Sequence, residues 1–147
     1  MTFEERKHAL ERAFNKGVPD NSPYVRRVFD MYRDEVAEID FMDCTLDYGK
    51  EDQALDVVLL FDYGIMLSIN FDLETPDSQR IPFNVYDKRE MIVADVMPLT
   101  TIVQYMTNVK RRFDELKNKT KDGKEDNQTD GGTGGQGNTG VEEGAAQ

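Results

Sequence analysis

Nucleophilic catalysis requires a nucleophile beside a general base, and the chain offers one cysteine, Cys44, and one histidine, His8. His8 lies in a charged N-terminal segment, whereas Cys44 shares an alternating apolar phase with Leu46 and Tyr48. We therefore expect Cys44 to be a small buried core residue. One Cys and one His also cannot supply the sulfur and imidazole ligands that zinc prefers. These residues predict neither a nucleophilic site nor a zinc site.

Carboxylates are the other candidates for chemistry. Asp43 and Asp47 share one phase of an expected strand, and Asp56 and Asp62 lie at the two ends of the next strand. Paired Asp residues on neighbouring strands can hold Mg²⁺ with waters completing its shell. Nuclease-type sites usually add a lysine two positions after an acidic ligand on a strand, and none occurs here. We therefore expect a protein that is not an enzyme and uses no metal or other cofactor, with metal-dependent catalysis as the least favoured alternative.

The charge of the chain is strongly acidic, with 18 Lys and Arg against 29 Asp and Glu and a net charge of −11. Such a field repels nucleic acid and anionic membranes and attracts basic partners. The acidic residues concentrate between Asp30 and Asp62, where eleven carboxylates stand against Arg33 and Lys50. From this stretch we select the candidate partner-binding residues Asp40, Asp43, Asp47, Glu51, Asp52, Asp56 and Asp62.

These carboxylates have two interpretations. The strand phases place Asp43, Asp47, Asp56 and Asp62 on one face of a sheet, where they could imitate the phosphates of a nucleic acid and occupy a basic groove. A solvated sheet face with negative edges that discourage aggregation explains the same pattern. We expect an acidic inhibitor that occludes a basic, nucleic-acid-handling surface of a partner protein, such as a phage or mobile element encodes against host defence.

A basic cluster near the end of the last expected helix supports an alternative. Clustered cations can contact nucleic acid through counterion release, but they also complement a helix dipole, which we favour here. Opposed acidic and basic surfaces also favour self-association. The alternative function is a structural or assembly subunit that forms a homo-oligomer such as a homodimer, with the tail as a tether. The cluster comprises Lys110, Arg111, Arg112, Lys117, Lys119, Lys121 and Lys124.

Three helices are expected to position these residues. Thr2 and Glu5 have the spacing of a capping box, which begins a helix that Gly17 closes. Ser22 followed by Pro23 is a typical start for a second helix. A continuous apolar stripe after residue 98 predicts the last and longest helix, which should lie across one face of the sheet.

The middle of the chain has the two-residue period of strands, over residues 43–48, 55–61, 65–71, 81–85 and 91–96, although the last segment is also compatible with a helical turn. Short turns predict antiparallel pairing. Apolar residues on both faces predict that the second strand is interior. Pro82 favours an edge position for the fourth strand.

Grouped helices and grouped strands predict an α+β fold, in which two N-terminal helices precede an antiparallel sheet of four or five strands packed by a long C-terminal helix. We expect one domain over residues 1–117 and a disordered, glycine-rich acidic tail over 118–147. The N-terminal segment lacks an apolar signal core, and the longest apolar run, Val57 to Phe61, is far too short to cross a membrane. We therefore expect a soluble protein of the cytoplasm.

Overall fold

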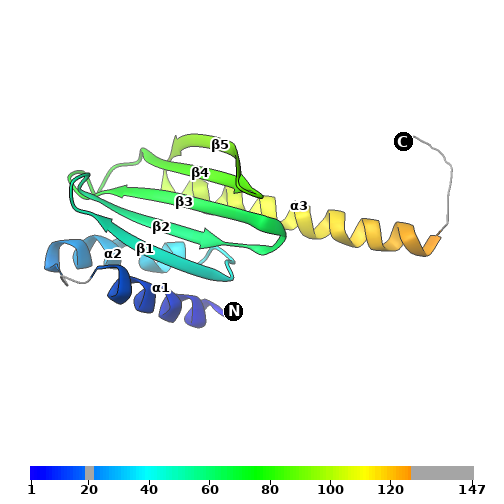
Figure 1. Ribbon diagram of the computed structural model, residues 1–147, viewed down its shortest axis with the longest axis horizontal. Coiled ribbons are helices and arrows are strands. Elements are labelled where there is room, and N and C mark those ends of the chain that lie inside the picture. Colours follow the sequence, from blue (N-terminus) through cyan, green and yellow to red (C-terminus); the bar gives the residue numbers. More distant parts are fainter. Residues whose placement is uncertain (19–21, 127–147) are drawn as a thin grey trace. The chain divides into compact units, whose positions relative to one another are not determined.

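The computed structural model describes residues 1–18 and 22–126 (Figure 1). Their contacts form two compact units, Met1–Thr107 and a second unit that begins at Asn108. The expected α+β fold is confirmed, with three helices and a five-stranded antiparallel sheet in the described part of the chain. The elements are α1 (Phe3–Gly17), α2 (Pro23–Val36), β1 (Asp43–Gly49), β2 (Ala54–Leu60), the 3₁₀ turn η1 (Asp62–Gly64), β3 (Ile65–Asp72), β4 (Ile81–Asp87), β5 (Glu90–Met97) and α3 (Leu99–Asp126).

The first two helices begin where the sequence predicts. The hydroxyl of Thr2 accepts the backbone N–H of Glu5 at 3.1 Å, and the Glu5 carboxylate accepts the Thr2 N–H at 2.7 Å. This second bond lowers the pKa of Glu5, because it favours the charged carboxylate. The hydroxyl of Ser22 accepts the Val25 N–H at 3.4 Å, and Pro23 occupies the first position of α2. Both predicted N-caps are confirmed.

The sheet is a meander in the order β1-β2-β3-β4-β5. The prediction that β4 is an edge strand was wrong, because β4 pairs with both β3 and β5. Pro82 is tolerated there because the paired residues of β3 and β4 end at Ile69 and Phe83, just before the position where a missing N–H would break the ladder. The segment 90–97 is a strand and not a helical turn.

The helices of the first unit pack on one face of the sheet, which we call the covered face (Figure 1). Tyr32 of α2 stacks on Phe71 of β3 with ring centroids 4.5 Å apart. Tyr105 of α3 meets Phe83 of β4 edge to face at 6.0 Å. These contacts fix α2 and the start of α3 on the same side of neighbouring strands.

No helix of the described unit Met1–Thr107 covers the opposite face, which we call the open face (Figure 1). Successive side chains of a strand alternate between the two faces, and a register shift between Val85 and Tyr86 leaves one extra residue on β5, so the paired residues define this face. Its residues are Asp43, Thr45, Asp47, Asp56, Val58, Leu60, Met66, Ser68, Asn70, Asp72, Pro82, Asn84, Tyr86, Met91, Ala94 and Val96.

Helix α3 extends to Asp126, past residue 117, where the sequence placed the end of the domain. Leu99, Ile102 and Met106 of its first turns are buried in the core of the first unit. Residues 118–126 of the predicted disordered tail therefore belong to α3. The rest of that tail, residues 127–147, lies outside the described residues.

The C-terminal end of α1 touches the backbone of edge strand β1. A Cβ atom placed on Gly17 would lie 1.6 Å from the carbonyl oxygen of Leu46. Such a distance is far inside van der Waals contact, and a backbone oxygen cannot rotate away. Glycine is therefore required for α1 to approach β1 this closely.

Gly17→Ala should therefore destabilise the fold by about 2–3 kcal/mol, because α1 must shift away from β1 and lose packing. Urea unfolding measures the change. Gly49→Ala is the matched control, since its Cβ would meet its nearest neighbour at an ordinary 3.7 Å. Equal losses of stability in the two variants would contradict the close approach of α1.

The turn between β4 and β5 holds two ordinary residues in the left-handed region, Lys88 at φ 51° and Arg89 at φ 74°. A two-residue hairpin turn with positive φ at both positions matches the twist of the strands, but Asn-Gly is the pair that adopts it with least strain. The Lys88 N–H donates to the carbonyl of Gly64 at 2.9 Å, which ties this turn to η1. Strand pairing and this hydrogen bond thus hold Lys88 and Arg89 in a backbone conformation that their side chains disfavour.

Replacing Lys88→Asn together with Arg89→Gly should stabilise the protein by about 1 kcal/mol, because both positions lose the left-handed penalty. The backbone N–H that bonds Gly64 is retained in this variant. A thermal or urea unfolding curve that is unchanged or shifted toward lower stability would contradict the expectation.

Candidate functional site

The predicted acidic residues meet most closely on the open face, at the end of the sheet nearest the β1–β2 turn. Asp47 of β1 lies directly opposite Asp56 of β2, and Asp56 lies opposite Asn70 of β3. The Nδ2 amide of Asn70 donates to Oδ1 of Asp56 at 2.7 Å. Directly opposite Cβ atoms in an antiparallel pair are about 5 Å apart, so the two carboxylates repel each other.

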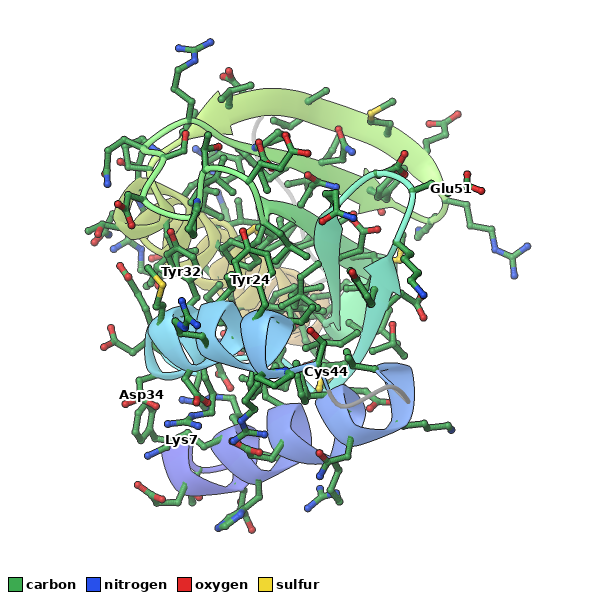
Figure 2. The ribbon with its side chains drawn as sticks, turned by 90° about the vertical axis from the view of Figure 1, so that its left-hand side faces the viewer. Lys7, Tyr24, Tyr32, Asp34, Cys44 and Glu51 are labelled. Atoms are coloured by element: carbon green, nitrogen blue, oxygen red, sulfur yellow. The ribbon has the colours of Figure 1, made fainter. Side chains whose placement is uncertain are left out.

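Neighbouring carboxylates extend this pair, and we call the five residues Asp47, Glu51, Asp52, Asp56 and Asp72 the acidic end. Glu51 and Asp52 lie in the β1–β2 turn, and Figure 2 shows Glu51 away from α1. Asp72 lies opposite Ala54 at the end of β3. Asp72 is not among the predicted residues, because it lies beyond the acidic stretch from Asp30 to Asp62. Its shared strand phase with Asn70 is the sequence signal that could have identified it.

Asp43 also faces the open side, but about 13 Å along β1 from Asp47. Its carboxylate accepts the N–H of the next residue, Cys44, at 2.8 Å. The other edge strand repeats this arrangement, since Asp95 accepts the N–H of Val96 at 2.7 Å. Satisfied edge N–H groups discourage pairing with another strand. Asp43 therefore protects the exposed edge of β1, which agrees with the interpretation that the carboxylates discourage aggregation.

Besides Asp43, two further predicted residues lie outside the acidic end. The expectation that Asp62 shares the sheet face was wrong, because β2 ends at Leu60 and Asp62 begins the η1 turn at the opposite end of the strand. Asp40 precedes β1, and its carboxylate lies 3.5 Å from the guanidinium of Arg6. The predicted set is therefore divided between the acidic end, the β1 edge and two loops.

Several carboxylates of α1 and α2 form ion pairs with basic neighbours, namely Glu11, Asp30 and Asp34. Glu11 lies 2.8 Å from Arg26 and 2.7 Å from Arg33. Burial tends to raise the pKa of Glu11, but the hydrogen bonds and charges of the two guanidinium groups outweigh it and lower the pKa. Lys7 of α1 lies 3.7 Å from Asp34 of α2 (Figure 2).

The acidic pair differs from these helical carboxylates. Within the residues whose side chains the structure describes, no Lys or Arg forms an ion pair with Asp47 or Asp56. Their mutual repulsion is therefore relieved by the Asn70 amide and by solvent, not by a cation. This end of the open face therefore carries two neighbouring negative charges without a paired cation among the described side chains.

A groove of about 480 Å³ runs between α1 and the edge strand, with Ala13, Lys16 and Gly17 on one side and residues 43–47 on the other. Cys44 lies in its wall and is 7% exposed, so its predicted burial is confirmed. Burial and the nearby charge of Asp43 raise the pKa of Cys44 to about 11. The thiol is therefore protonated at neutral pH, and a protonated thiol is a poor nucleophile.

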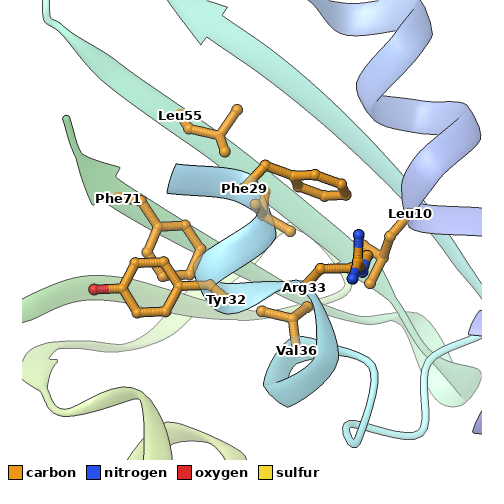
Figure 3. Close-up of a pocket in the computed structure, with 8 residues that line it drawn as sticks. Leu10, Phe29, Tyr32, Arg33, Val36, Leu55 and Phe71 are labelled. Carbon is orange, nitrogen blue, oxygen red and sulfur yellow. The ribbon is translucent and has the colours of Figure 1, made fainter. Parts of the chain in front are cut away.

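A second cavity lies in the core beneath α2, between Leu10, Tyr32 and Phe71 (Figure 3). Its volume of about 10 Å³ is near the minimum that holds one water molecule. It is a packing defect between the helices and the sheet and cannot take a larger ligand.

Within the described residues, no three His, Cys, Asp or Glu side chains are placed to share a metal ion. The same part of the chain contains no helix with the length and apolar character needed to cross a membrane. Comparisons with protein-family models, curated proteins and solved structures find no match for the chain. The interpretation of the candidate site therefore depends on the geometry of its residues alone.

Removing one charge of the acidic pair should stabilise the sheet. We expect Asp47→Asn to raise the free energy of unfolding by about 0.5 kcal/mol at low salt, since like charges directly opposite each other are destabilising. The gain should shrink as salt screens the repulsion. Asp34→Asn is the control, because it removes a carboxylate that has basic partners and should not stabilise. An Asp47→Asn variant less stable than the wild type would show that the pair is not under electrostatic strain.

Proposed function

We propose that the chain is a non-catalytic binding protein whose acidic end docks on a basic, nucleic-acid-handling surface of a partner protein and blocks it. The observation that carries this proposal is the pairing of Asp47 with Asp56 on an uncovered sheet face, without a cation among the described side chains. A cation supplied by the partner would relieve the repulsion that the pair carries in the free protein.

The charge pattern supports a nucleic-acid-binding surface as the target. Such surfaces gain affinity by neutralising closely spaced phosphates and releasing their counterions. Neighbouring strands are about 4.8 Å apart and residues on one face recur about every 7 Å, so the acidic end offers a comparably dense array of anions. The array is held by β1, β2, β3 and one short turn, which keeps its carboxylates in place before binding.

Apolar side chains on the same face as the acidic end support a protein partner. Val58 is partly buried, Leu60 is 39% exposed, and Met66 lies opposite Leu60 on β3. Protein interfaces combine an apolar centre with a polar or charged rim. A target protein can bury these side chains while its basic residues meet the acidic end. We place this interaction in the cytoplasm, where the free thiol of Cys44 stays reduced.

An assembly subunit is the second candidate. Strand β5 exposes Met91 at 56%, Ile92 at 51% and Val96 at 38%, which is unusual for an apolar edge strand of a monomer. A subunit of this kind would bury β5 in a larger assembly, and its oligomer would persist in high salt.

The blocking function is tested by capture from a nuclease-treated cell lysate on the immobilised full chain. Proteins that bind nucleic acid should be retained at low salt and should elute when salt is raised or when duplex DNA is added, because DNA competes for the same basic surface. Asp47→Asn combined with Asp56→Asn should retain several-fold less of the same proteins.

The matched control is Glu4→Gln combined with Glu38→Gln, which removes two exposed charges from the helical side of the molecule. This control should retain as much protein as the wild type. The blocking function is wrong if duplex DNA does not compete, or if the control and the Asp47 and Asp56 variant lose binding equally.

A further inference from the structure

The proposed function leaves a basic and apolar stripe on α3 without a role. Arg112, Leu116 and Lys119 follow one another at intervals of four and three residues, so they lie on one side of the helix. Leu116 is 56% exposed, and both flanking cations are exposed as well. We call these three residues the α3 stripe. An exposed leucine between two cations is complementary to an apolar surface with an acidic border.

The open face has this complementary pattern. Leu60, Met66, Tyr86 and Met91 lie opposite one another on β2 to β5 and form an apolar row across the sheet. The acidic pair lies four residues away along β2, which corresponds to about 13 Å. A helix is about 10–12 Å across, so one helix can lie across the strands between the apolar row and the acidic pair.

The lengths also agree. Five strands spaced about 4.8 Å apart give the sheet a width of about 19 Å. Residues 108–119 of α3 span about 17 Å at a rise of 1.5 Å per residue. Because the stripe has a cation at each end, one of the two cations reaches the acidic pair whichever way the helix lies along the row.

We propose that the α3 stripe docks on the open face of a second copy of this chain, and that the two copies exchange the contact about a two-fold axis. Every copy carries both surfaces, so a two-fold pair makes the same contact twice and closes without free ends. This inference uses the same face as the proposed function but does not depend on it. The dimer covers the acidic end, so a partner protein competes with self-association.

The mass of the purified full chain in solution tests the dimer directly. At low salt, light scattering should give twice the chain mass of 16.8 kDa, and high salt should shift the mass toward that of one chain. A single-chain mass at low salt and high protein concentration overturns the proposal, as does a series of ever larger assemblies.

Charge exchange tests which surfaces meet. Arg112→Glu with Lys119→Glu should be monomeric, and Asp47→Lys with Asp56→Lys should be monomeric, because each variant opposes like charges at both contacts. An equimolar mixture of the two variants should form the dimer again, since every contact then pairs a cation with a carboxylate. Two variants that remain dimeric alone, or folded variants that stay monomeric when mixed, overturn the assignment.

Two further variants keep the test independent of folding defects. Asp47→Asn with Asp56→Asn removes the attraction without reversing it and should weaken the dimer several-fold. Arg12→Glu with Arg27→Glu changes the net charge as much as Arg112→Glu with Lys119→Glu does, but at exposed positions of α1 and α2, and it should leave the dimer intact. Equal weakening by this control would assign the effect to net charge and overturn the specific contact. Partner capture by a chain that never dimerises would leave the blocking function intact while removing this inference.

Discussion

The fold of the first unit depends on the packing of its helices on one face of a five-stranded sheet. The Tyr32–Phe71 stack and the Phe83–Tyr105 contact fix α2 and the start of α3 there, and Phe14 of α1 stacks on Phe29 of α2 at 4.5 Å. Since strand side chains alternate, every second residue of the sheet must face the other way. The open face is therefore a direct consequence of where the aromatic residues pack.

The acidic residues divide into three physical situations. On the helices, carboxylates such as Glu11 are held by arginines that are themselves packed over aromatic rings, as Arg26 is over Phe14 at 5.3 Å. At the sheet edges, Asp43 and Asp95 satisfy outward N–H groups. At the acidic end, Asp47 lies opposite Asp56, which accepts a hydrogen bond from Asn70, and Asp72 accepts the Glu74 N–H and the Thr75 hydroxyl. The acidic residues thus stabilise the helices and protect the sheet edges, and at the acidic end they form a surface suited to binding.

The proposed binding of a partner and the proposed self-association would use the same face. The acidic pair shares the open face with apolar side chains, so an occupant that covers this face must supply both cations and apolar contacts. The α3 stripe and a basic target protein both meet this requirement. Under the two proposals they would exclude each other, so the concentration of the chain would control the proposed blocking.

Local sequence determined the element types and most of their ends, because a capping box, an N-cap followed by proline and the period of the apolar residues act between neighbours in the chain. Thr2 and Ser22 begin helices for this reason, and the strand phases put Asp47 and Asp56 on one face. Tertiary structure decided what depends on register and on contacts between distant segments. Only the pairing of strands could make β4 interior despite Pro82, set Asp47 directly opposite Asp56, bring Asp72 to the same end and leave Asp62 in a turn. The close approach of Gly17 to Leu46 likewise arises between segments that share no local pattern.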